Sequence, residues 1–217
     1  MKGRMIKTLS EQEVSIPSGS VTLAGNLVLP GSCRSAVIFA HGSGSSRHSP
    51  RNRFVAGVLQ EAGIGTLLFD LLTPGEDTVY ANRFNIDLLV ERLKASTHWL
   101  RERPEAAGFS LGYFGASTGT AGALRAAAES GSVIRAVVSR GGRPDLAGPA
   151  LPRVTAPVLL IVGGNDHQVL DLNREAYARI KAEKDLAIVP GATHLFEEPG
   201  ALEEASRLAV TWFKERL

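Results

Sequence analysis

The sequence Gly115-Ala116-Ser117-Thr118-Gly119 is the stretch that decides the predicted fold. It follows an apolar run that ends at Phe114 and precedes an alanine-rich segment of helical composition. A serine between two glycines at such a place is typical of a sharp turn from a strand into a helix, which exposes the serine hydroxyl. A glycine-rich turn with an incidental serine has the same letters, so the interpretation depends on what the rest of the chain supplies.

Short apolar runs alternate with amphipathic segments on both sides of this turn. The runs expected to form strands cover residues 14–16, 21–29, 36–40, 66–69, 109–114, 133–138, 158–162 and 186–189. The segments with helical spacing cover residues 54–62, 86–100, 121–129, about 170–182 and 202–213. The first two strands, separated by Pro17-Ser-Gly-Ser20, predict an antiparallel hairpin. The alternation that follows predicts an α/β fold with parallel pairing through right-handed crossovers.

Bulk composition narrows the class of protein. A chain of 217 residues fits one domain over residues 1–217, and a net charge of +2 argues against nucleic acid or a membrane surface as the main partner. The single cysteine, Cys33, excludes an intramolecular disulfide and favours the cytoplasm. Residues 1–7 lack the apolar core of a signal peptide, and no apolar run approaches the length of a membrane span. Histidine and cysteine lack zinc spacing, so we expect neither a metal nor a cofactor.

Three residues with complementary chemistry follow predicted strands. A serine hydroxyl needs a neighbouring base, which His194 could provide, and Asp166 could fix the tautomer of that histidine. We therefore predict Ser117 as nucleophile, His194 as general base and acid, and Asp166 as orienting acid. The alternatives are a helix N-cap role for Asp166 and a loop position without function for His194. Asp145, after the earlier strand, is a rival for the orienting carboxylate.

The segment His41-Gly-Ser-Gly44 also follows a predicted strand. Its backbone could present the Ser43 N–H to a developing oxyanion, with the Thr118 N–H as the second donor. A plain turn at a strand end is the alternative. The order of nucleophile, acid and histidine, with the oxyanion segment earlier in the chain, separates this arrangement from other serine-triad folds. Because all four segments lie at strand ends, one shared site is a better explanation than separate accidents.

These four segments together resemble the α/β-hydrolases, and most closely the compact dienelactone hydrolase-like branch. The matching residues are His41-Gly-Ser-Gly, Gly115-Ala-Ser-Thr-Gly, Gly164-Asn-Asp and Gly191-Ala-Thr-His. The resemblance implies an eight-stranded, mostly parallel sheet and a serine esterase mechanism. Dienelactone hydrolases proper carry a cysteine nucleophile where this chain has Ser117, so their narrow lactone substrate is not carried over.

The segments around the site suggest how the pocket is shaped. The interval between Ser117 and Asp166 leaves little room for a large cap domain, which favours a shallow pocket for small esters. Two arginine-rich loops should lie on its rim, and Arg47, Arg51 and Arg140 are candidates for binding an anionic group of the substrate. Solvated charges and local ion pairs are the alternative for these loops.

The sequence thus predicts a cytoplasmic carboxylic ester hydrolase that acts on a small molecule. It leaves open a thioesterase or peptidase with the same triad, a hydrolase-fold binding module with a vestigial site, and a module that works fused or bound to another enzyme. It also leaves open whether the protein is a monomer or a homodimer.

Overall fold

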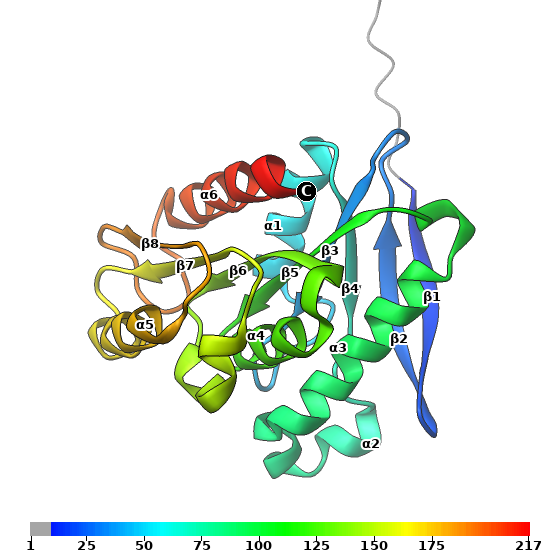
Figure 1. The fold of residues 1–217 in the computed structure, drawn as a ribbon, viewed down its shortest axis with the longest axis horizontal. Helices are drawn as coiled ribbons and strands as arrows, with labels where there is room; N and C mark the ends of the chain where they lie inside the picture. The colour runs from blue at the N-terminus through cyan, green and yellow to red at the C-terminus, as the bar shows by residue number, and fades with distance from the viewer. Residues whose placement is uncertain (1–9) are drawn as a thin grey trace, which may run out of the picture.

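The computed structural model of the chain describes residues 10–217, so the charged segment 1–7 lies outside the described residues. Eight strands form one sheet in the order β1-β2-β4-β3-β5-β6-β7-β8 (Figure 1). The strands are β1 Glu11–Ser18, β2 Val21–Val28, β3 Ser35–Ala40, β4 Gly65–Phe69, β5 Ser110–Ala116, β6 Ile134–Arg140, β7 Val158–Gly163 and β8 Lys184–Val189. This is the α/β-hydrolase fold class that the sequence predicted.

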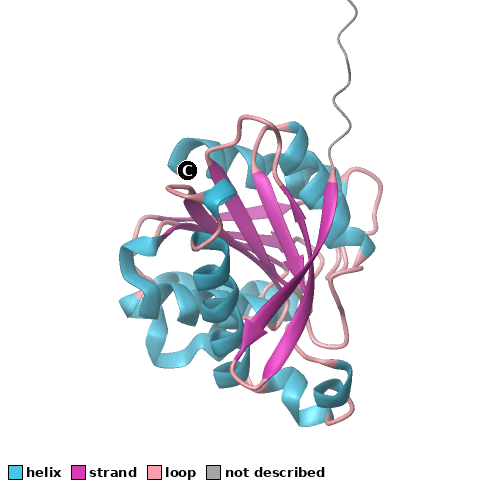
Figure 2. Cartoon of the chain, turned by 90° about the vertical axis from the view of Figure 1, so that its right-hand side faces the viewer, coloured by secondary structure: helices cyan, strands magenta, loops and turns pink. Residues whose placement is uncertain are grey.

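Strand pairing follows the predicted hairpin and crossovers. β2 pairs antiparallel with β1 and with β4, and all other neighbours are parallel. The hairpin turns at Gly19, whose φ of +59° lies in the left-handed region that favours glycine. Figure 2 shows the twist of the sheet, with the long β1–β2 pair at one edge. The carboxyl ends of the parallel strands therefore lie at the same end of the sheet, which is where ligands bind in such folds.

Helices cover both faces of the sheet. The α-helices are α1 Pro50–Glu61, α2 Pro74–Asp77, α3 Ile86–Arg101, α4 Gly119–Ser130, α5 His167–Arg179 and α6 Ala201–Arg216, and the 3-10 segments are η1 Tyr80–Phe84, η2 Pro104–Ala106, η3 Gly131–Val133 and η4 Pro144–Arg153. α1 and α6 pack on one face, through side chains such as Leu59 and Phe213. α3, α4 and α5 pack on the other (Figure 1).

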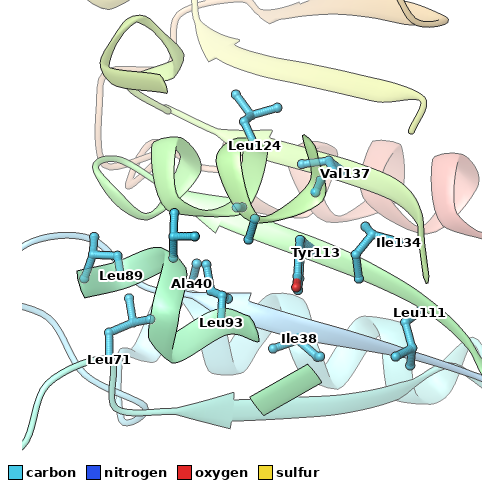
Figure 3. Packing of buried hydrophobic residues seen from close by; sticks show 14 of the residues in the cluster. Ile38, Ala40, Leu71, Leu89, Leu93, Leu111, Tyr113, Leu124, Ile134 and Val137 are labelled. Carbon is cyan, nitrogen blue, oxygen red and sulfur yellow. The ribbon is translucent and has the colours of Figure 1, made fainter. Parts of the chain in front are cut away.

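The core on the α3–α4 face fixes the position of the central strands. Figure 3 shows Leu93 of α3 near Ile38 of β3 and Tyr113 of β5, while Leu124 of α4 lies farther from Ile38 in the same hydrophobic cluster. Tyr113 is fully buried, and its hydroxyl lies 2.6 Å from Thr97 Oγ1, so the buried polar atom has a partner. Burial raises the pKa of Tyr113 to about 12.

The interval between Ser117 and Asp166 holds α4, η3, β6, η4 and β7. The proline- and glycine-rich stretch between β6 and β7 forms the 3-10 segment η4, which contains three prolines and packs against α4 and α5. It is too short to make a helical cap. None of the helices in residues 10–217 combines the length and the apolar character that a membrane crossing requires.

Candidate active site

Ser117 occupies the turn between β5 and α4 with a φ of +49°, a strained conformation for a residue other than glycine. Only Phe196 shares a positive φ among the non-glycine residues of the described chain. The flanking glycines make the turn possible. A Cβ at Gly115 would lie 2.6 Å from Thr120 Cα, and one at Gly119 would lie 2.2 Å from the Ala40 carbonyl oxygen. The two glycines thus allow α4 to start directly against β3 and β5, with Ser117 at the apex.

Asp166 and His194 form a direct contact across the carboxyl ends of β7 and β8. His194 Nδ1 lies 2.7 Å from Asp166 Oδ2. Asp166 stands at the N-cap position of α5 but makes no side-chain capping hydrogen bond, so its carboxylate serves His194 instead of the helix. The carboxylate is 14% exposed and the imidazole 39% exposed, which leaves the ring within reach of a ligand. A carboxylate on Nδ1 favours the tautomer whose Nε2 is free to accept a proton.

The rival carboxylate is used elsewhere. Asp145 accepts two hydrogen bonds from Arg143, at 2.8 Å and 2.7 Å. This ion pair holds the start of η4, and it does not involve His194. Of the two candidate carboxylates, the geometry brings only Asp166 to the histidine.

Ser117 and His194 line one pocket of about 260 Å³. No hydrogen bond joins Ser117 Oγ to His194 within the described residues. Such contacts often lengthen in the absence of substrate and tighten when the acyl group is bound. Gly141 lies beneath the histidine, because a Cβ there would be 3.1 Å from the His194 carbonyl oxygen. The pocket is bounded by the ends of β5 and β6, by the loops after β3 and β8, and by the start of α1.

The backbone near Ser117 offers two hydrogen-bond donors. Among residues 10–217, neither the Ser43 N–H nor the Thr118 N–H donates to another protein group. Gly42 brings the first of these segments close, since a Cβ at Gly42 would lie 3.0 Å from Ser117 Cβ. Ser43 lines the pocket beside Ser117.

His41 fixes the loop that carries Ser43. Its Nε2 accepts a hydrogen bond of 3.0 Å from the Leu71 N–H, so the ring proton is on Nδ1, which lies 2.9 Å from the Gly42 carbonyl oxygen. In a trans peptide the carbonyl and the following N–H point in opposite directions, so holding the Gly42 oxygen orients the Ser43 N–H. Burial lowers the pKa of His41, which keeps the ring neutral. This role of His41 could not be predicted from the sequence, because nothing in the local sequence distinguishes it from a turn residue.

The structure separates the three candidate arginines. Arg47 donates from its backbone and its guanidinium to Asp70 and from Nε to Asn26, and it does not line the pocket. Asp70 thus has a structural role, because it holds the backbone and the side chain of Arg47. Arg51 and Arg140 both line the pocket with Ser117.

The remaining histidines lie outside the pocket. His98 is exposed on α3, His48 is exposed in the loop before α1, and His167 is the exposed first residue of α5. Cys33 is a buried free thiol. In the part of the chain that the structure describes, no group of three or more His, Cys, Asp or Glu side chains is arranged to hold a metal ion.

The fold and the strand-end site define an α/β-hydrolase. A family model for the dienelactone hydrolase family matches residues 67–216. The chain belongs to this family. The crystal structure of a dienelactone hydrolase from Anabaena variabilis is 53% identical, with a TM-score of 0.93, and the match covers 96% of this chain and 99% of that one.

The chain is also similar to a more distant solved structure and to two longer proteins. Est1E from Butyrivibrio proteoclasticus shares the fold at 17% identity, with a TM-score of 0.79 and coverage of 94% of this chain and 98% of that one. Two Mycobacterium tuberculosis proteins named "Putative phosphoribosyl transferase" are 57% identical over 209 residues. That match covers 96% of this chain but only 47% of each relative. The chain therefore spans about half the length of the curated relatives that it matches.

Proposed function

We propose that this hydrolase cleaves carboxylic esters through an acyl-enzyme formed on Ser117. The observation that carries the proposal is the Asp166–His194 contact of 2.7 Å at the rim of the pocket that holds the strained serine turn. A carboxylate that stands at a helix N-cap position but binds an imidazole instead of the helix is arranged to orient that ring and to stabilise its protonated form.

The proposed reaction uses these groups in two half-reactions. Ser117 Oγ attacks the carbonyl carbon of the ester while His194 Nε2 takes the hydroxyl proton. The Ser43 and Thr118 N–H groups stabilise the resulting oxyanion. Collapse of the tetrahedral intermediate breaks the bond to the alcohol, which leaves with the proton from His194. Water then attacks the acyl-enzyme with His194 as base. The bond to Ser117 Oγ breaks, the acid product is released, and His194 returns the proton to Ser117.

The size of the pocket favours small substrates. Its volume of about 260 Å³ fits a short acyl or aryl group better than a long lipid chain. A thioester or an amide would react at the same atoms, so substrate profiling has to separate the three classes.

Short 4-nitrophenyl esters and a fluorophosphonate probe test the proposal. We expect turnover and covalent labelling of the native protein, and we expect Ser117→Ala to abolish labelling and to reduce kcat roughly 10⁶-fold. Ser110→Ala, at the opposite end of β5, is the matched control and should keep both activities. A native protein that neither turns over an ester, thioester or amide nor labels at Ser117 would show that the site is vestigial.

The length of the mycobacterial relatives favours a second proposal, that this hydrolase unit works joined or bound to another enzyme. The transferase name belongs to proteins of which this chain matches 47%, and we assign no transferase activity to the α/β-hydrolase fold described here. Mass measurement of the native protein isolated from its source tests this idea. A free species of 23.0 kDa alone would contradict it.

A further inference from the structure

We propose that Arg140, assisted by Arg51 and the N-terminus of α1, binds an anionic oxygen group carried by the substrate, either a phosphate or a carboxylate. The inference rests on the proposed function, because it names the class of ester that the Ser117 site accepts. It deepens that function by assigning a recognition group next to the reacting atoms.

Arg140 is placed beside the nucleophile by the sheet. It is the last residue of β6 and pairs in register with Ala116, the residue before Ser117. Only 7% of Arg140 is exposed, yet it lines the pocket that holds Ser117 and His194. A guanidinium at this place lies deep in the site rather than on its rim.

The hydrogen-bonding capacity of Arg140 is almost unused. Its only hydrogen bond within the described residues joins Nη2 to Asn52 Oδ1 at 3.3 Å, while Nε and Nη1 have no partner. Its guanidinium carbon lies 5.7 Å from the centroid of the Phe196 ring, which packs the group without satisfying the remaining donors. Buried cations are normally paired, because an unpaired charge away from water is costly.

Arg92 shows what a structural buried arginine looks like in this chain. It is also 7% exposed, but its guanidinium binds Glu76 at 2.6 Å and the Ser18 side chain at 2.8 Å. Arg140 takes part in no salt bridge among residues 10–217. The difference is that Arg140 lines the pocket, so an anion bound there would supply the missing negative charge.

The surroundings of Arg140 add to its positive potential. Burial, together with the positive charge of Arg51, lowers the pKa of Arg140 to about 10, so its guanidinium is still charged at neutral pH. Arg51 donates at 2.9 Å to Glu197, whose side chain is 65% exposed and can be displaced toward water. The described lining of the pocket contains no carboxylate.

The helix α1 points its N-terminus at the same place. Ser49 caps the helix, Asn52 belongs to its first turn, and that turn has no acidic residue. Ser49 and Asn52 both line the pocket. The N-terminus of a helix of 12 residues favours negative charge, so it reinforces the two arginines. Planar guanidinium groups bind phosphate and carboxylate through paired hydrogen bonds.

Kinetics on matched esters test this assignment. The 4-nitrophenyl esters of hexanoic acid, adipic acid and 5-phosphonopentanoic acid differ in the charge at the far end of the acyl chain. We expect the native enzyme to prefer one anionic ester over the neutral ester, and the ratio of their kcat/KM values to fall roughly 10- to 100-fold in Arg140→Gln. Arg51→Gln, on the surface of α1, should lower the same ratio. The control Arg53→Gln removes an equal charge from α1 at a residue that pairs with Glu11, and should leave the ratio unchanged.

A binding measurement separates this inference from the proposed function. In Ser117→Ala, inorganic phosphate or acetate should raise the thermal unfolding midpoint above that in sodium chloride of equal ionic strength, and adding Arg140→Gln should abolish the rise. Preferences for phosphonate or carboxylate identify which anion is bound. The inference would be overturned if Arg140→Gln, Arg51→Gln and Arg53→Gln all kept the native ratio of kcat/KM for anionic over neutral esters and if neither anion raised the unfolding midpoint of Ser117→Ala. This holds even if ester turnover is intact. If the native protein turned over no ester but phosphate or acetate still raised the unfolding midpoint of Ser117→Ala, only the proposed function would be contradicted.

Discussion

Replacing Gly119 by alanine should damage both the stability and the activity of this protein. The added Cβ would lie 2.2 Å from the Ala40 carbonyl oxygen and 2.5 Å from that of His41. Both distances are well below the 3.4 Å at which ordinary van der Waals contact begins, and both partners are backbone atoms. The start of α4 must therefore move away from the end of β3, carrying the Thr118 N–H with it.

The loss of stability expected for Gly119→Ala can be compared with the effect of the same substitution at Gly57. Overpacking costs about 1–3 kcal/mol, and the rigid backbone neighbours place Gly119→Ala at the upper end, about 3 kcal/mol. For a chain of this size that corresponds to a fall of roughly 6–12 °C in Tm. At Gly57 of α1, an added Cβ would meet nothing within 4 Å, so Gly57→Ala should stabilise the helix by up to about 1 kcal/mol.

Thermal and urea unfolding of the two variants, with ester turnover measured in parallel, provide the assay. Gly119→Ala should also lower kcat and leave KM nearly unchanged, since in the proposed mechanism the displaced Thr118 N–H stabilises the oxyanion rather than the bound ester. If Gly119→Ala unfolds within about 0.5 kcal/mol of the native protein, which is the size expected of neutral surface changes, the close approach of α4 to β3 is not what requires the glycine.

Two further predictions concern the site. Asp166→Asn should lower kcat roughly 10⁴-fold, because an amide no longer holds the His194 tautomer, while Asp171→Asn on the exposed face of α5 should leave it unchanged; equal rates in both variants would contradict the triad. The lowered pKa of His41 makes the folded protein bind its proton at lower pH than the unfolded chain does. Its contribution to stability is therefore complete above pH 6.5 and is lost as pH falls through the folded pKa, so urea unfolding should show a steeper acid loss in the native protein than in His41→Gln.

The strands and helices were predictable because buried elements have apolar residues in continuous runs or at regular spacing. The prediction for the last helix, residues 202–213, lies inside α6, whose observed bounds are Ala201–Arg216. The start of α5 was placed too late: the helix begins at His167, but its first buried residue is Val169, so a reading of apolar spacing misses the polar first turn. The same limit explains η4, where proline and glycine signal a loop although local backbone bonds form a 3-10 segment.

The three arginines show where prediction from sequence ends. Arg47, Arg51 and Arg140 were equivalent candidates, because each lies in or beside a polar loop after a strand. The structure gives Arg47 a carboxylate partner, gives Arg51 an exposed one, and leaves Arg140 buried without any. Which charge is satisfied depends on neighbours that are distant along the chain, as with Asn52 and Arg140, which are 88 positions apart.

The sequence alone determined the order of Ser117, Asp166 and His194 and their places after buried strands, because apolar runs and turn residues are local properties of the chain. Only the tertiary structure decided that Asp166 binds His194, 28 positions away, rather than capping its own helix, and that His41 holds the loop that carries Ser43. Local sequence offers each polar side chain several partners at similar free energy. The sheet selects among them by fixing which strand ends lie side by side.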